Sequence, residues 1–384
     1  MPVTVDTFQR EMIRQLLDEG LDVTLVSSPG DRLSDVAADL GVESVAVPMM
    51  RALSPLRDVV ALGRWLVLLA RLRPDLVVAA TPKASLLAML AARVTRVPVR
   101  LYSAVGLRLE GEHGWRRALL VTMERLTAGS ATAVVPNSPS LAARYRDLRL
   151  ARPSTLFPTR PASSHGVDTD HFTPRDRDPS IAEQLGLGDG RRVIGFVGRL
   201  TRDKGIDDLV AAAALVEAAG VPTRLLVVGP QDEPDSSHYL EVLRAGPVPV
   251  VALGEVSDVR PYLACMDVHV LPTLREGFPN VVLEAGAMGI PTVTTRATGS
   301  VDSVDDGVTG LLVDVHDPKG LADAMTRILR DPDLGRRLGE AARAVAIEQF
   351  DPQAVVRSHL APAMAALGLV GREGVGSWEP SPRG

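Results

Sequence analysis

The chain has 384 residues. A single hydrophobic core seldom extends over so many residues, so this length predicts two domains. Hydrophobic residues make up 46% and charged residues 23%, a balance typical of soluble globular proteins. The net charge of −5 argues against nucleic-acid binding as the main function. The single cysteine, Cys265, excludes an intrachain disulfide and a cysteine zinc cage, and it favours a cytoplasmic location.

Short β-rich runs alternate with helical stretches along the whole chain, which predicts βαβ units and parallel sheets. In the first half we predict strands at Leu21–Ser27, Leu76–Ala80, Val99–Ser103 and Ala133–Pro136, and helices at Phe8–Glu19, Leu56–Leu72, Ala84–Val94 and Trp115–Ala128. In the second half we predict strands at Val193–Val197, Arg224–Val228, Val250–Leu253, Val268–Leu271, Thr292–Thr295 and Gly310–Val313, and helices at Ile206–Ala219, Val259–Ala264, Val281–Met288 and Leu321–Leu329.

The segment Ala151–Gln184 is rich in Pro, Ser, Asp and Arg and carries no long periodic run, so it predicts the boundary between domains. We expect an α/β fold of two Rossmann-like domains, residues 1–168 and 169–349, facing each other across a ligand cleft. Residues 371–384 resemble a disordered tail. The opening MPVTV resembles only the end of a first strand, so either the start lies upstream or this domain lacks that strand.

The motif GRLTRDKG follows the apolar run VIGFV at the end of a predicted strand. Gly198 permits close backbone approach to a ligand, Arg199 can fork onto phosphate oxygens, and Lys204 supplies a point charge. A helix from Ile206 would add its N-terminal amides. The pattern predicts a phosphate site, although a solvated polar loop fits the same residues.

The motif EGFPNVVLE places Glu276 and Glu284 on either side of a turn that opens a helix. Pro279 suits the first helical turn, and ionised carboxylates accept hydrogen bonds from paired sugar hydroxyls. The amides of Gly277, Phe278 and Asn280 can point at a sugar or its phosphate. Cations for phosphates beside carboxylates for hydroxyls predict a nucleoside diphosphate sugar as the ligand.

With these motifs, Val193–Val315 resembles the retaining GT-B glycosyltransferases of family 4, and VVGP, LGEVSDV and DGVTGLLV fit the same pattern. The first half resembles a bacterial branch that builds polysaccharides and other glycoconjugates. The resemblance implies that Arg199 and Lys204 bind the donor diphosphate and that Glu284 binds ribose. It places Glu276 at the transferred sugar and the loop at Val256 near the base. It also implies that residues 350–370 form a helix crossing back to the first domain.

The resemblance therefore implies transfer of a hexose, most simply from a UDP-linked donor, to an acceptor hydroxyl with retention of anomeric configuration. Arg199, Lys204 and Glu276 are the expected catalytic residues, with no metal and no cofactor besides the donor substrate. The acceptor is a glycan, a lipid-linked saccharide or a small molecule. Two alternatives stay open: a GT-B nucleotide-sugar epimerase, and a nucleotide-sugar-binding partner without catalysis.

Several segments have uncertain roles. Many relatives carry a polar residue after the VRLYS strand, where this chain has Ala104–Gly106; Glu110 nearby could add a polar contact. The sequence Asp168-Thr169-Asp170 spells a metal-binding pattern of another fold, but here we expect a turn. Arg64, Arg71 and Arg73 with Trp65, and Arg116 and Arg117 with Trp115, form basic and aromatic helix faces. Such faces fit peripheral contact with the inner face of a membrane, or ordinary solvated helices.

Overall fold

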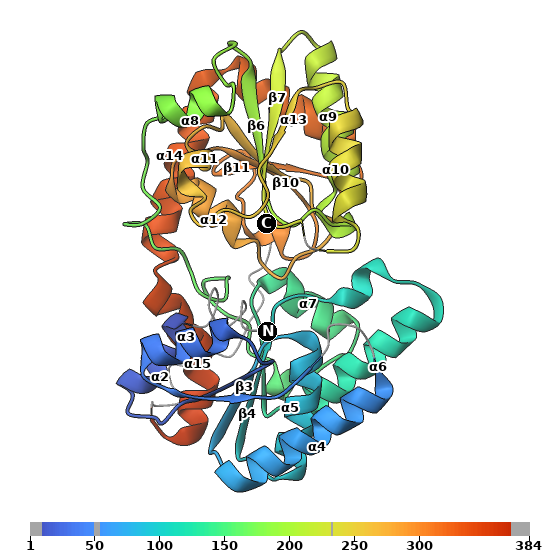
Figure 1. Cartoon of the computed structure of the whole chain (residues 1–384), viewed down its shortest axis with the longest axis vertical. Helices are drawn as coiled ribbons and strands as arrows, with labels where there is room; N and C mark the ends of the chain where they lie inside the picture. Colours follow the sequence, from blue (N-terminus) through green and yellow to red (C-terminus); the bar gives the residue numbers. More distant parts are fainter. Residues whose placement is uncertain (1–9, 50–53, 232, 370–384) are drawn as a thin grey trace. The chain divides into compact units, whose positions relative to one another are not determined.

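The computed structural model describes residues 10–49, 54–231 and 233–369 (Figure 1). The chain divides into two compact units, one of residues 1–166 together with 352–384 and the other of residues 167–351. The predicted boundary after residue 168 lies two residues beyond this division. Each unit is an α/β domain built on parallel strands, which confirms the predicted fold class.

The described part of the first unit has two parallel sheets. In one, β1 (Thr24–Ser27) pairs with β2 (Glu43–Ala46). In the other, the order is β3–β4–β5, with β3 at Leu76–Ala79, β4 at Val99–Ala104 and β5 at Ala133–Pro136. These three strands lie within one residue of their predicted bounds at each end.

Helices cover both faces of the three-stranded sheet, because side chains alternate between the faces along each strand. Tyr102 and Val134 pack toward α4, α5, α6 and α7, whereas Leu101 and Val135 pack toward α2 and α15. The helices of this unit are α2 (Arg10–Asp18), α3 (Asp31–Leu40), α4 (Pro55–Leu72), α5 (Pro82–Val94), α6 (Gly114–Ser130), α7 (Pro139–Asp147) and α15 (Pro352–Leu367).

The N-terminal part of this unit corrects the sequence prediction. The strand predicted at 21–27 is shorter, and its partner β2 and the helix α3 were not predicted. The reason lies in the residues of β2: Glu43–Ala46 has no buried side chain, so it lacks the apolar alternation that marks a strand. The MPVTV segment, the first two residues of the helix predicted at 8–19 and the tail at 371–384 lie outside the described residues.

The second unit has one six-stranded parallel sheet of order β11–β10–β9–β6–β7–β8. Each strand agrees with its prediction to within one residue at either end. Their apolar side chains are buried on both faces, as expected for parallel strands covered by helices. The strands are β6 (Arg192–Val197), β7 (Thr223–Val228), β8 (Val250–Ala252), β9 (Val268–Leu271), β10 (Thr292–Thr295) and β11 (Gly310–Val313).

Seven helices of the second unit surround this sheet in the described ranges. Three of them, α8, α10 and α14, were not predicted from the sequence. No helix in the described ranges is both long and apolar enough to cross a membrane. The helices are α8 (Pro179–Gln184), α9 (Ile206–Ala218), α10 (Ser236–Ala245), α11 (Arg260–Leu263), α12 (Asn280–Ala287), α13 (Pro318–Arg330) and α14 (Pro332–Gln349).

Candidate functional site

The two motif loops meet at the carboxyl edge of the second unit's sheet. They follow β6 and β9, which are neighbouring parallel strands, so both loops leave the sheet at the same edge. The carbonyl oxygen of Asp203 accepts hydrogen bonds from the amide of Leu274 at 2.8 Å and from the Thr273 hydroxyl at 2.9 Å. The backbone thus fixes the basic loop against the acidic one.

Glycines make this close approach sterically feasible. Gly205 has a φ of 68°, and a Cβ at this position would lie 1.9 Å from the carbonyl oxygen of Pro272. Gly229, with a φ of 149°, leaves space for the carbonyl of Gly198, which would lie 2.0 Å from an added Cβ. Neither gap accepts a side chain, so the loops pack backbone against backbone.

Lys204 and Glu276, both predicted site residues, are in direct contact. The Lys204 ammonium donates to Oε1 of Glu276. The Thr273 hydroxyl oxygen lies 3.1 Å from the same carboxylate oxygen, which is an alternative acceptor to the Asp203 carbonyl for its single proton. Their side chains are only 13% and 15% exposed, so the pair lies in a largely desolvated position where its mutual attraction is strong.

Arg199 is more solvent-exposed than Lys204. Its guanidinium donates to Oε1 of Glu233 at 3.1 Å, and its side chain is 49% exposed. Nearby, Asp203 pairs with Arg275 at 3.4 Å. Burial acts to raise the pKa of Asp203, but the Thr201 side chain and the charges of Arg275, Lys204 and Arg199 outweigh it, and the pKa is lowered. The loop therefore holds its acids ionised beside its cations.

The segment from Glu276 to Asn280 is held by the loop after β10. The Glu276 amide donates to the carbonyl of Thr298 at 2.8 Å, and a Cβ on Gly299 would lie 2.2 Å from the carbonyl oxygen of Gly277. Asn280 begins α12 and Pro279 stands at its N-cap, one position before the first-turn place that the sequence predicts.

Phe278 has a different surrounding from its neighbours. Its ring is buried and stacks on Phe350, with ring centroids 5.7 Å apart. Only its backbone remains to meet a ligand. The Phe278 side chain is therefore a packing residue, and it explains why an aromatic residue stands between polar positions of the motif.

Glu284 lies in the second turn of α12, where burial raises the pKa of its carboxyl group to about 7. In the part of the chain that the structure describes, no group donates a hydrogen bond to this carboxylate. An unbonded carboxylate in a desolvated position is prepared to accept hydrogen bonds from a ligand. Val256, after β8, is half-buried and packs against the apolar cluster of Leu226 and Val228.

The predicted residues are thus only partly brought together. Lys204 touches Glu276, while Arg199 reaches a residue that the sequence reasoning missed, Glu233. Thr273 was missed too. A signal for Thr273 existed, since a hydroxyl three residues before Glu276 can reach back to its side chain; Glu233 stands in a stretch with no distinctive pattern.

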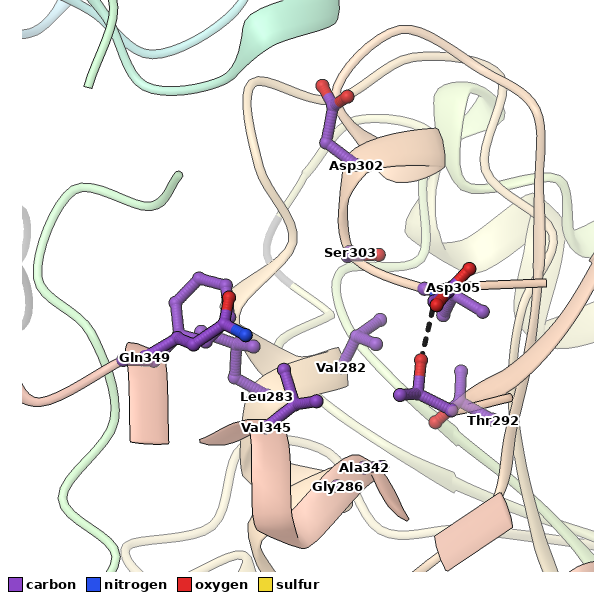
Figure 2. A pocket seen from close by; sticks show the side chains of 13 residues that line it. Val282, Leu283, Gly286, Thr292, Asp302, Ser303, Asp305, Ala342, Val345 and Gln349 are labelled. Carbon is purple, nitrogen blue, oxygen red and sulfur yellow. Dashed lines mark hydrogen bonds between the residues drawn. The ribbon is translucent and has the colours of Figure 1, made fainter. Parts of the chain in front are cut away.

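A separate cavity of about 330 Å³ lies beneath α12, between that helix, α14 and the turn at residues 300–305. Figure 2 shows Val282, Leu283 and Val345 on one side of it and Asp302 and Asp305 near the other. Its lining contains none of the predicted donor-site residues and no lysine or arginine. A cavity with carboxylates and no cation does not suit a diphosphate.

Two other predicted features have local roles. Oδ1 of Asp168 accepts from the amides of Asp170 and His171 at 3.0 and 2.9 Å, so the Asp-Thr-Asp segment forms the expected turn. Glu110 accepts from Arg144 at 2.9 Å. Across the described ranges, no three His, Cys, Asp or Glu side chains gather in a way that could hold a metal ion.

Comparison with known proteins agrees with this architecture. Residues 191–331 match the family model described as glycosyl transferases group 1, and residues 4–158 match the glycosyl transferase 4-like domain. The chain is 32% identical over 349 residues to the capsular polysaccharide biosynthesis glycosyltransferase CapM of Staphylococcus aureus, covering 90% of each.

A second relative is 26% identical over 365 residues, 92% of this chain and 93% of the other. It is the N,N'-diacetylbacillosaminyl-diphospho-undecaprenol alpha-1,3-N-acetylgalactosaminyltransferase of Campylobacter jejuni. Among solved structures, that of Anabaena HepE in complex with UDP-glucose matches with a TM-score of 0.74 and 20% identity, over 93% of this chain and 96% of that one.

Two α/β units with parallel sheets, the second with cations and carboxylates at its carboxyl edge, define a glycosyltransferase of the GT-B class. The chain belongs to the family 4 glycosyltransferases.

Proposed function

We propose that this enzyme transfers a hexose from a nucleoside diphosphate donor to an acceptor hydroxyl with retention of anomeric configuration. The observation that carries the proposal is the contact between Lys204 and Glu276 at the carboxyl edge of the second unit's sheet. The contact supports the proposal because Lys204, the proposed cation for phosphate oxygens, lies next to Glu276, the proposed carboxylate for sugar hydroxyls. Polysaccharide or glycoconjugate synthesis is the proposed setting, supported by the similarity to CapM.

Each site residue has a proposed task. Arg199 and Lys204 bind the diphosphate and neutralise the charge that develops as it departs. Glu276 binds hydroxyls of the transferred sugar, and Glu284 binds the ribose. Gly198, Gly277, Phe278, Pro279 and Asn280 contribute backbone at the donor, and Val256 lies at the base.

The reaction balances without a protein base. The bond between the anomeric carbon and the phosphate oxygen breaks, and a bond to the acceptor oxygen forms on the same face of the sugar. The acceptor proton passes to the departing phosphate. Since Arg199 and Lys204 supply the positive charge, we propose that no metal is required, and the test is full activity in the presence of EDTA.

A UDP-linked donor is proposed because the Anabaena protein of the same fold has been crystallised with UDP and with UDP-glucose. The acceptor class stays a glycan, a lipid-linked saccharide or a small molecule. The Campylobacter relative, whose name specifies an undecaprenol-linked substrate, favours the lipid-linked class. A cytoplasmic location with peripheral contact at the membrane's inner face is part of the proposal.

The first experiment is calorimetric titration of UDP, GDP, ADP and TDP into the purified chain. Arg199→Ala and Lys204→Ala should each weaken binding of the preferred nucleotide by roughly 10- to 100-fold, the value of a charge-assisted hydrogen bond. Arg202→Ala is the matched control, because Arg202 is an exposed arginine of the same loop. It should change the affinity less than threefold, as expected of a solvated charge.

Equal losses in Arg202→Ala and Arg199→Ala would contradict the assignment of the phosphate site. Incubation of the donor without an acceptor then distinguishes a glycosyltransferase from an epimerase, since an epimerase would invert a stereocentre of the donor's sugar. NMR of the glycoside formed from an α-linked donor tests retention, and a β-linked product would refute it.

A further inference from the structure

Helix α4 of the first unit is apolar on two opposite sides. Ala61, Trp65 and Leu69 are buried and pack in the core. On the other side, Leu56 is 85% and Val67 is 52% exposed. Val60, which is 56% exposed, continues this stripe, since residues four and seven apart share a helix face. Soluble helices seldom leave such a stripe uncovered.

Arginines accompany the exposed stripe of α4. Arg57, Arg64 and Arg71 are spaced seven residues apart and are all exposed, so they form a row along the helix. The one acidic residue of α4, Asp58, pairs inward with Lys83 at 2.7 Å. Trp65, which the sequence analysis grouped with this basic face, instead lies in the core. The outward charge of α4 is therefore positive.

Helix α6 repeats this pattern. Trp115, Leu119 and Leu126 are 72%, 39% and 49% exposed, and they lie on one side of the helix. The guanidinium carbon of Arg116 lies 5.7 Å from the centroid of the Trp115 ring. Helix α5 packs against both α4 and α6, so the three helices form one layer on the same face of the sheet (Figure 1).

The charge of this region is opposite to that of the whole chain. Residues 54–130 contain eleven arginines, one lysine and five acids, a net charge of +7. Because the whole chain carries −5, the remaining residues carry −12. A surface that combines exposed apolar side chains with concentrated positive charge fits an anionic lipid bilayer.

We propose that the exposed sides of α4 and α6, here called the α4–α6 face, dock on a membrane rich in anionic phospholipid. The arginines bind lipid phosphates, while Leu56, Val60, Val67 and Trp115 enter the boundary between headgroups and acyl chains. A second copy of the chain is a poorer occupant, since pairing two such faces would bring arginines against arginines.

This inference develops the membrane contact of the proposed function, but its test is independent of the donor site. Every residue of the α4–α6 face belongs to the first unit, whereas every proposed donor residue belongs to the second. A variant of the face can therefore lose lipid binding while it keeps UDP binding, and a variant of Lys204 should do the reverse. Failure of one proposal is distinguishable from failure of the other.

The experiment is co-sedimentation of the full chain with vesicles, at low salt and at about 0.5 M salt, where charge interactions are screened. One set contains phosphatidylcholine alone, and the other contains about one-third phosphatidylglycerol. We expect binding to the anionic set at low salt only. Arg64→Gln, Arg71→Gln and Arg116→Gln together should weaken it about 100-fold, at about fivefold for each arginine.

A matched control removes the same charge from elsewhere. Arg244→Gln, Arg327→Gln and Arg337→Gln replace three exposed arginines on helices of the second unit, and this variant should bind vesicles like the parent chain. A second variant, Val67→Ser with Trp115→Ser, tests the apolar part and should weaken binding about tenfold or more. Urea denaturation of each variant checks that the first unit remains folded, because the proposed UDP site lies in the second unit and does not report on it.

The outcomes decide the proposal. Anionic-selective binding that the face variants lose and the control keeps supports it. No vesicle binding, equal binding to both lipid sets, or equal loss in the control triple overturns it. A concentration-dependent dimer that Val67→Ser with Trp115→Ser abolishes, without vesicle binding, would assign the face to a second copy and also overturn the lipid proposal.

Discussion

The two units share the βαβ architecture but differ in where their charged side chains lie. The second unit has one continuous six-stranded sheet, and charged side chains gather in the loops at its carboxyl edge. In the described residues, the first unit has two smaller sheets and a run of small and apolar residues after β4, and many of its arginines lie on outward faces of helices. One unit thus concentrates its charge in a polar site, and the other spreads its charge over a surface.

The largest effect that we expect tests how tightly the second unit's loops pack. Gly205→Ala should lower the free energy of unfolding by about 3 kcal/mol or more, because a left-handed φ and a clash with the carbonyl oxygen of Pro272 add together. Urea denaturation measures this loss. Gly220→Ala is the control, since Gly220 has a φ of 80° and nothing within 4 Å of an added Cβ.

Only the conformational cost, about 1 kcal/mol, is expected for Gly220→Ala. Similar losses for the two variants would mean that the backbone contact between the motif loops does not stabilise the unit. The close packing of the motif loops would then not distinguish the second unit from the first.

The next effect compares the sheets directly. Amides of β1 and β2 should exchange hydrogen about 100-fold faster than those of β6 and β7, because a two-stranded sheet opens at a lower free energy than the centre of a six-stranded one. Hydrogen exchange with mass spectrometry measures both in one sample. Equal protection would indicate that the two units are equally cooperative.

A smaller effect follows from the raised pKa of Glu284. An ionised carboxylate accepts hydrogen bonds from ribose, so with a pKa of about 7 the ionised fraction rises about tenfold from pH 6 to pH 8. Affinity for UDP-glucose should rise by a similar factor over that range. Calorimetry on Glu284→Gln should give a weaker and pH-independent affinity; an unchanged pH profile would refute the assignment.

Ionisation of Glu284 should increase the affinity for UDP-glucose but decrease the free energy of unfolding. Its folded-state pKa of about 7 exceeds the ordinary glutamate pKa of 4.5, so the folded state holds the proton more tightly. The stabilisation is therefore present at low pH and is lost as the pH rises through 7. Relative to the parent chain, Glu284→Gln should gain stability in urea denaturation between pH 5 and pH 8.

The smallest effect concerns Glu110, a polar candidate of the first unit. Since Glu110 accepts a hydrogen bond from Arg144, Glu110→Gln should cost about 1 kcal/mol of stability and change UDP affinity less than twofold. Glu276→Gln, its counterpart in the second unit, should weaken binding of UDP-glucose. An equal loss of affinity for both would place Glu110 in the donor site.

The sequence predicted the second unit well for physical reasons. Its strands are apolar on both faces, and a phosphate site requires particular residue types, so GRLTRDKG and EGFPNVVLE stand out. β2 was not predicted because its side chains are not buried, and the adjacent helix α3 was not predicted either. The pairing of Arg199 with Glu233 and the buried ring of Phe278 depend on tertiary contacts that no local pattern encodes.

The contact between Lys204 and Glu276 has a consequence for selectivity. In the empty site the ammonium already has an internal counterion, so a simple anion such as inorganic phosphate must compete with a carboxylate that is held in place. In the proposed assignment, a nucleotide sugar brings both replacements at once, since its diphosphate suits the lysine and its hydroxyls suit the glutamate. We therefore expect the empty site to discriminate against small anions such as inorganic phosphate and still to bind the proposed donor.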